Sequence, residues 1–234
     1  MTNSTVHARP GSSMAARLAI AAIAMYQVLL LAVIFIKPDV DPTRKPVSEY
    51  AIGRYGWVMV LAFLTAAVSY GCLFVAVRGL VRGVAGRAGL AILGLCVLGT
   101  VGVGVFVADP VVTPLTELTT IGSLHVICGL SALVLLPVAA LLINQDVARG
   151  NPTVALALRW TAGLPLAGLV LHWVLSLAVP PEGWPPRFLF LTYAVWLIAL
   201  ATQILRAYRH ATTADPSVVA TPPGPRMSFV DGSE

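Results

Sequence analysis

The chain has 234 residues, of which 58% are hydrophobic and 11% are charged, whereas soluble domains carry about 25% charged residues. This composition excludes a water-soluble globular fold. The 15 basic and 10 acidic residues are spaced so that six long stretches contain no charge. A bilayer core of about 30 Å is crossed by about 20 helical residues, so each stretch is long enough to span a membrane.

The uncharged stretches predict an all-α integral membrane bundle of six transmembrane helices. In chain order, the predicted spans are about 16–36, 56–77, 88–108, 121–143, 158–179 and 188–206. The stretches are apolar on all sides, unlike the amphipathic helices of a soluble core. They are also much longer than the strands of a membrane β-barrel, which have about ten residues.

The first span and the two ends of the chain define the limits of the bundle. Span 16–36 is longer than the hydrophobic core of a signal peptide and is followed by no small-residue cleavage site, so we expect it to be retained. Residues 1–15 are polar, and residues 207–234 are rich in Thr, Pro, Ser and Gly. These two segments are predicted to be disordered cytoplasmic tails.

The positions of Lys and Arg predict the orientation, because cytoplasmic segments of membrane proteins are enriched in these residues. Ten lie on the side shared by the two tails: Arg9, Arg17, Arg78, Arg82, Arg87, Arg149, Arg159, Arg206, Arg209 and Arg226. Five lie on the other side: Lys37, Arg44, Lys45, Arg54 and Arg187. Both termini are therefore expected in the cytoplasm, with the chain in the plasma membrane of a cell. The Arg-rich and Ala-rich composition suggests a high-GC bacterium.

The three loops predicted on the outer side differ in composition from the inner loops. They cover residues 37–57, 108–125 and 179–188 and combine prolines, acidic residues and aromatic or hydroxyl side chains. A ligand site is therefore expected to open outward. The net charge of +5 is explained by topology, so no nucleic-acid partner is expected. The three cysteines, Cys72, Cys96 and Cys128, fall inside spans and offer no disulfide framework.

Two histidines inside the spans are the most informative residues. His125 lies about 6 Å along the fourth span from its outer end and His172 about 10 Å along the fifth, so their depths are similar. Ionisable side chains within a span usually face the bundle interior or a water-filled cavity. Four interpretations stay open: a structural polar cluster, a site for a substrate or lipid headgroup, a metal site completed by Asp109 or Glu117, and axial ligation of a haem.

Charged residues near the outer boundary can complete this site. The hypothesis is a lipid headgroup or small amphiphile bound by Glu49, Arg54, Asp109, His125, His172 and Arg187. In this arrangement Arg54 and Arg187 hold an anion such as a lipid phosphate, and the histidines donate or accept protons. The alternative for the two arginines is ion pairing with Glu49, Asp109 or Glu182.

Membrane lipids are therefore the expected partners, and neither a cofactor nor an enzymatic activity is the leading interpretation. One alternative is a membrane-embedded hydrolase or transferase that uses His125 and His172, with or without a metal ion. No Gly-x-Ser-x-Gly or His-Glu-x-x-His motif accompanies these histidines. A second alternative is a small-solute transporter, for which Pro137 and Pro165 offer mild helix kinks.

Four short motifs occur in order along the chain. They are Ser48-Glu49-Tyr50-Ala51-x-Gly53-x-x-Gly56-Trp57, Asp109-Pro110, Gly122-x-Leu124-His125 and Gly183-Trp184-Pro185-x-Arg187. Together they resemble the bacterial and archaeal membrane family called domain of unknown function 998, over about residues 15–207. The resemblance implies six spans, a chain of about this length and motifs that face outward, without a settled activity.

Overall fold

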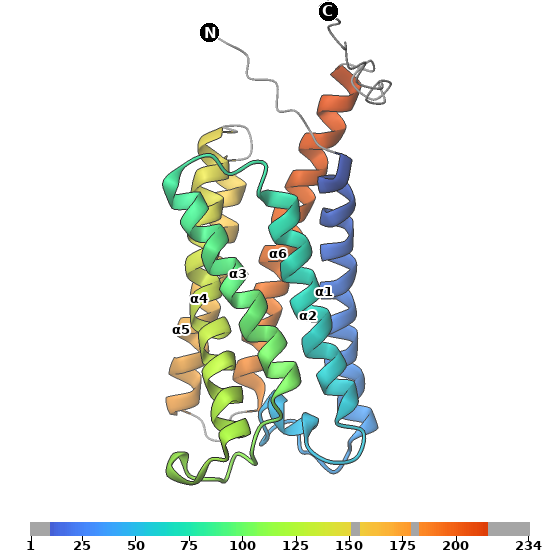
Figure 1. Ribbon diagram of the computed structural model, residues 1–234, viewed down its shortest axis with the longest axis vertical. Helices are drawn as coiled ribbons and strands as arrows, with labels where there is room; N and C mark the ends of the chain where they lie inside the picture. Colours follow the sequence, from blue (N-terminus) through green and yellow to red (C-terminus); the bar gives the residue numbers. More distant parts are fainter. Residues whose placement is uncertain (1–9, 151–154, 179–182, 215–234) are drawn as a thin grey trace, which may run out of the picture.

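The computed structural model describes residues 10–150, 155–178 and 183–214, and it contains six long helices (Figure 1). The helices are α1 (Pro10–Ile36), α2 (Trp57–Val77), α3 (Val84–Val105), α4 (Thr120–Gly150), α5 (Ala155–Ala178) and α6 (Trp184–Ala214). Two short 3-10 helices, η1 (Val47–Ala51) and η2 (Leu115–Glu117), lie in loops. All six long helices are apolar and long enough to cross a membrane. The predicted all-α, six-span fold is therefore confirmed.

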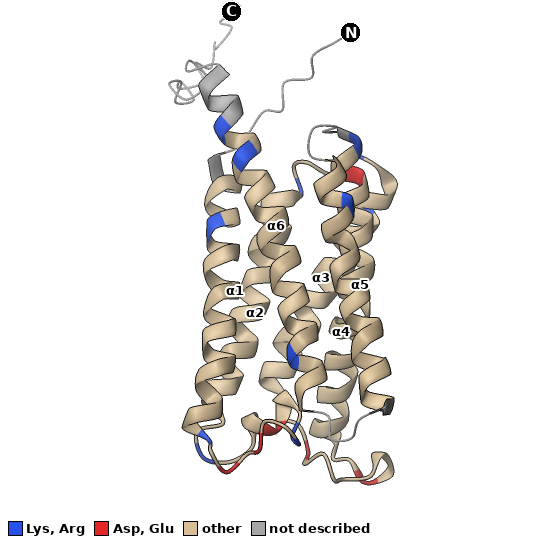
Figure 2. Cartoon of the chain, turned by 180° about the vertical axis from the view of Figure 1, so that it is seen from behind, with Lys and Arg blue, Asp and Glu red and all other residues tan. Residues whose placement is uncertain are grey.

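The helices run alternately up and down and form a closed ring. Each helix packs against its neighbours in the chain, and α1 packs against α6 (Figure 1). Helix α1 begins and α6 ends at the same end of the bundle, which we call the tail end. The opposite end, the loop end, carries a first loop (residues 37–56) and a second loop (residues 106–119). Figure 2 shows that most basic residues lie toward the tail end and that most carboxylates lie at the loop end.

Helix boundaries differ from the predicted spans because hydropathy marks the membrane-embedded part of a helix and not its ends. Helix α1 begins at Pro10 and α6 continues to Ala214, so parts of both predicted tails are helical. The remaining tail residues, 1–9 and 215–234, lie outside the described residues. Helix α3 stops at Val105, three residues before its predicted end at residue 108. Pro137 and Pro165 lie inside α4 and α5 without ending them.

The interior of the bundle is densely filled in the half nearer the tail end. Large side chains from four helices are at most 1% exposed there: Leu73, Leu93, Leu136, Ile143, Trp196 and Leu200. A buried polar group joins three helices, because Asn144 on α4 donates to the Leu158 carbonyl on α5 at 2.8 Å and accepts from Trp196 Nε1 on α6 at 3.3 Å. These contacts close the interior toward the tail end.

Candidate functional site

A cavity of about 250 Å³ lies inside the bundle in the half nearer the loop end. All six long helices contribute to its wall, and Pro46, Val47 and Ser48 of the first loop cover it. Most of the wall is apolar. Its polar side chains are Tyr26, Ser48, Tyr70, Thr100, His125, His172 and Tyr193. The cavity is thus an apolar chamber with a small set of hydroxyl and imidazole groups.

His125 lies on α4 and is 7% exposed. Its Nδ1 is 2.6 Å from the Phe106 carbonyl at the end of α3, and because a carbonyl only accepts, Nδ1 is the donor. In a neutral imidazole this fixes Nε2 as the nitrogen with a free lone pair. The ring edge also contacts Phe63, with 6.3 Å between ring centroids. His125 is therefore held in one orientation, and Nε2 is left to accept a hydrogen bond or a proton.

His172 lines the same cavity from α5. It is partly buried, and its ring is tilted against Trp173 with 5.6 Å between centroids. Trp173 itself is 48% exposed on the outside of the bundle. The structure thus brings the two histidines predicted inside the spans into one cavity.

Arg187 lies in the first turns of α6 and is 8% exposed, although the sequence placed it at the membrane surface. Its Nη1 donates to the Pro42 carbonyl at 3.1 Å, to the Lys45 carbonyl at 3.4 Å and to the Gly183 carbonyl. The guanidinium also lies over the Tyr50 ring, 5.5 Å from its centroid. Its neighbours Pro186 and Phe190 line the cavity, so Arg187 sits at the cavity's margin under the first loop.

Glu49 and Asp109 hold the loops together and do not line the cavity. Glu49 pairs with Lys45 at 3.4 Å and accepts from the Val111 backbone N–H, which joins the first loop to the second. Asp109 accepts from the Thr119 backbone N–H at 2.7 Å and from its hydroxyl at 3.0 Å, at the start of α4. Both carboxylates therefore have a structural role. They accept hydrogen bonds from backbone N–H groups that have no partner within a helix.

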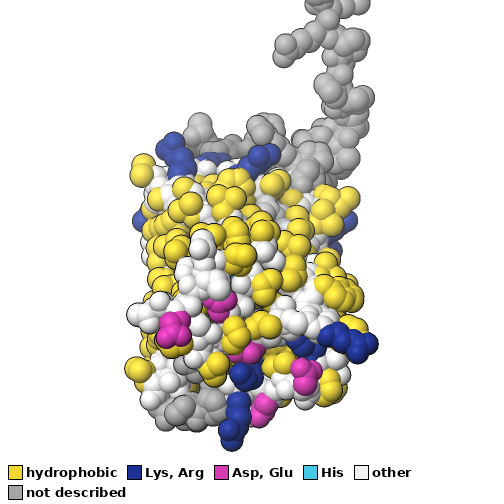
Figure 3. Space-filling view, turned by 60° about the horizontal axis from the view of Figure 1, so that its bottom comes forward, with side chains coloured by type: hydrophobic (Ala, Val, Ile, Leu, Met, Phe, Trp, Pro, Cys, Tyr) yellow, Lys and Arg dark blue, Asp and Glu magenta, His cyan; other side chains and the backbone are white. Residues whose placement is uncertain are grey.

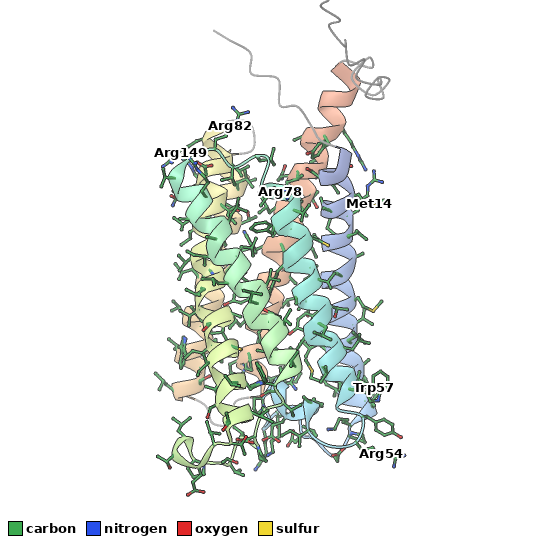
Figure 4. All side chains as sticks on the ribbon, in the orientation of Figure 1. Met14, Arg54, Trp57, Arg78, Arg82 and Arg149 are labelled. Atoms are coloured by element: carbon green, nitrogen blue, oxygen red, sulfur yellow. The ribbon has the colours of Figure 1, made fainter. Side chains whose placement is uncertain are left out.

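Arg54 is exposed and lies outside the cavity, so the structure does not support its predicted place in one site with the histidines. Its guanidinium stacks over Tyr55, 4.7 Å from the ring centroid. Arg54 and Trp57 point away from the bundle at the loop end (Figure 4). Neither Arg54 nor Arg187 is ion-paired with a carboxylate of the described residues. Glu182, the third proposed partner, lies outside the described residues.

Tyr50 and Lys37 hold the first loop in place beside Arg187, and neither was among the predicted site residues. The Tyr50 side chain is fully buried and donates to the Val40 carbonyl at 2.9 Å. Burial raises the pKa of the Tyr50 phenol, although the charge of Arg187 opposes this, so the phenol is neutral at pH 7. Lys37, 4% exposed, donates to the carbonyls of Tyr50 and Ile52 and anchors the first loop.

Three tyrosines in the cavity wall were also missed. Tyr26, Tyr70 and Tyr193 all lie inside predicted spans. Because a polar group within a span usually faces the interior, these tyrosines were predictable in the same way as the histidines. Tyr193 donates to the Leu133 carbonyl at 2.5 Å, across the interface between α6 and α4.

The described residues contain no group of three or more His, Cys, Asp or Glu side chains that can hold a metal ion. Of the two proposed third ligands, Asp109 is hydrogen-bonded to Thr119, and Glu117 lies in the exposed 3-10 helix η2. On the outside, the sides of the bundle are mainly hydrophobic, while charged side chains gather at the loop end (Figure 3).

Comparison with known proteins identifies one match. A family model described as protein of unknown function (DUF998) matches residues 19–203, which include parts of all six long helices. The resemblance predicted from the four motifs is confirmed. No curated protein and no solved structure matches the chain.

Proposed function

Since the chain belongs to the DUF998 family, a membrane family without an assigned function, we propose its function from the cavity: it binds a lipid headgroup or a small amphiphile. The observation that carries the proposal is that both histidines within the spans line one mostly apolar cavity in the half of the bundle next to the loops. An apolar wall with a few convergent polar groups is the usual composition of a small-molecule site.

The volume of the cavity limits the size of the bound group. At about 250 Å³ it is slightly smaller than the usual range of roughly 300–1,000 Å³ for ligand pockets. A headgroup with its first few carbons fits this space, whereas a whole two-chain lipid does not. The remaining chain would lie against the hydrophobic outer surface of the helices, in the bilayer.

The two histidines supply the chemistry for a polar headgroup. With Nδ1 donating to the Phe106 carbonyl, His125 offers Nε2 to a hydroxyl or ammonium group of the ligand. The hydroxyls of Thr100 and Ser48 add further polar positions to the wall. Thr100 already donates to the Cys96 carbonyl at 2.8 Å, so its oxygen is the part that can accept.

The packing toward the tail end favours binding over passage through the bundle. A transporter needs a second opening, and the interior beyond the cavity is filled by Leu93, Leu136 and Trp196. A path in that direction requires the helices to separate. We therefore rank a binding protein ahead of a transporter.

A hydrolase or transferase is the second candidate, and one observation favours it: Ser48 lines the cavity together with His125 and His172. A hydroxyl nucleophile needs an adjacent base, and histidine is the commonest one. If Ser48 is the nucleophile of such an enzyme, Ser48→Ala should abolish turnover of an ester amphiphile without preventing its binding.

Filling the cavity tests the binding function. Gly129 lines the cavity, and a Cβ at this position would meet only Val103, at 3.5 Å. In Gly129→Leu the added side chain should occupy the cavity and displace the ligand. Purified protein is analysed by native mass spectrometry for lipid carried over from the membrane, and by titration with dioctanoylglycerol and dioctanoyl phosphatidic acid.

The matched control is Gly71→Leu on α2, where a Cβ would meet nothing within 4 Å and does not enter the cavity. We expect Gly129→Leu to lose at least tenfold in affinity for the amphiphile that wild type binds best, and Gly71→Leu to bind as wild type does. Equal binding by both variants, or no amphiphile bound by wild type, would overturn the proposal.

A further inference from the structure

The charge of Arg187 is buried, and no carboxylate of the described residues balances it. Among the described residues, ion pairs join Arg44 to Asp41 and Lys45 to Glu49, and none includes Arg187. The guanidinium lies over the rings of Tyr50 and Trp184, 5.5 Å and 5.8 Å from their centroids, and both side chains are neutral. A buried cation without an opposite charge is costly, so such residues usually mark a site for an anion.

The hydrogen bonds of Arg187 divide its guanidinium into two edges. Nη1 is used by the Pro42, Lys45 and Gly183 carbonyls, which fix the plane of the group. Nε and Nη2 are buried and have no hydrogen-bond partner. These two nitrogens form one side of the planar group, and that side binds a carboxylate or phosphate through two parallel bonds.

Arg187 lies between two residues of the cavity wall. Pro186 and Phe190, on either side of Arg187 in α6, both line the cavity. The start of α6 also contributes the positive end of its dipole, which favours an anion. An oxyanion bound to Arg187 would therefore lie close to a molecule in the cavity.

We infer that Arg187 binds the oxyanion of an anionic amphiphile through Nε and Nη2, with the adjoining apolar part of that molecule in the cavity. The inference rests on the proposed function and narrows its ligand class to amphiphiles with a phosphate or carboxylate group. Arg54, exposed and stacked on Tyr55, has no part in this site.

The first test uses the unaltered protein and two probes that differ only in the phosphate. Two charge-assisted hydrogen bonds are worth at least about tenfold in affinity. Wild-type protein in a maltoside micelle should therefore bind dioctanoyl phosphatidic acid at least tenfold more tightly than dioctanoylglycerol, measured by native mass spectrometry and by quenching of tryptophan fluorescence. Inorganic phosphate is the third probe. If it binds as tightly as dioctanoyl phosphatidic acid does, the site binds a free anion, and the inference of an amphiphilic ligand is overturned.

The second test removes the Nε and Nη2 donors of Arg187 but keeps the positive charge at this position. Arg187→Lys should weaken binding of dioctanoyl phosphatidic acid by about tenfold to a hundredfold and leave that of dioctanoylglycerol unchanged. Arg54→Lys is the matched control and should change neither. Glu182→Gln tests whether a carboxylate outside the described residues balances Arg187, and it should leave phosphatidic acid affinity and the melting temperature unchanged.

The outcomes separate this inference from the binding function on which it rests. If Gly129→Leu prevents binding while the phosphate makes no difference and Arg187→Lys binds as wild type does, the cavity binds a neutral amphiphile and the role of Arg187 is wrong. If Glu182→Gln lowers the melting temperature as much as Arg187→Lys does, the two residues form an internal ion pair, which also overturns the inference. If wild type binds neither amphiphile, the binding function itself fails.

Discussion

At the residue scale, two acidic side chains bind backbone N–H groups next to the starts of helices. The first N–H groups of a helix have no partner within the helix, and a carboxylate from elsewhere in the chain can supply one. Asp109 accepts from the Thr119 N–H directly before α4, and Asp146 accepts from the N–H groups of Arg82 at 2.8 Å and of Gly83 at 3.0 Å directly before α3. A Cβ on Gly86 would lie 2.6 Å from the same carboxylate, so glycine is required there.

Replacing Asp146 should therefore destabilise the bundle. Asp146→Ala leaves the Arg82 and Gly83 N–H groups without their partner, and we expect a loss of about 1–3 kcal/mol in the free energy of unfolding. The measurement is unfolding by SDS in mixed micelles. Glu117→Ala, in the exposed 3-10 helix of the second loop, is the control and should change the free energy by less than about 0.5 kcal/mol. Equal losses in both variants would contradict the role of Asp146.

At the element scale, α3 and α4 approach closely because glycines of α3 face α4. A Cβ on Gly99 would lie 2.8 Å from the Cys128 carbonyl oxygen, and one on Gly102 would lie 3.0 Å from the Cys128 Cβ. Small residues at an interface let membrane helices pack closely where no hydrophobic effect drives them together. Gly104 faces α2 and a Cβ on Gly94 would meet nothing within 4 Å, so the glycines of α3 serve different faces.

This contact predicts that the same Gly→Ala substitution at two positions on α3 changes the free energy of unfolding differently. Gly99→Ala should lower the free energy of unfolding by about 1–3 kcal/mol, because the new methyl group meets the backbone of α4, which cannot move aside alone. Gly94→Ala adds the same methyl group in open space and should be neutral or slightly stabilising, since alanine favours helix more than glycine does. SDS unfolding of both variants measures the difference, and similar values for both would refute the close contact.

At the scale of the whole molecule, the closed ring creates an interior that no single helix has. The half nearer the tail end is filled by large apolar side chains, and the half nearer the loops keeps a cavity under the first loop. Arg78, Arg82 and Arg149 lie at the tail end (Figure 4). If the tail end is cytoplasmic, as the basic residues predict, the side of the cavity that the first loop covers faces away from the cytoplasm.

The orientation can be measured with two matched cysteine variants. Val112 in the second loop is 79% exposed, and Val84 at the start of α3, at the tail end, is 78% exposed. A membrane-impermeant maleimide added to intact cells should label Val112→Cys, and it should label Val84→Cys only after permeabilisation. Wild type, whose cysteines lie within helices, is the blank. The reverse pattern would place the tails outside.

The membrane-spanning architecture followed from the sequence because it depends on local properties. Uncharged stretches of about 20 residues can satisfy their backbone hydrogen bonds in a bilayer only as helices, so length and hydropathy predict the six spans. The two histidines were identified in the same way, because the cost of a polar group in a span does not depend on which helix is its neighbour.

The partners of each side chain required the tertiary structure. Glu49, Arg54, Asp109 and Arg187 all lie near one membrane boundary in sequence, but a boundary is a whole face of the bundle, and hydropathy gives no position around it. The folded chain directs Arg54 outward, uses Glu49 and Asp109 in loop contacts, and buries Arg187 beside the cavity. Only the closure of the ring, with α1 against α6, decides which side chains meet in the interior.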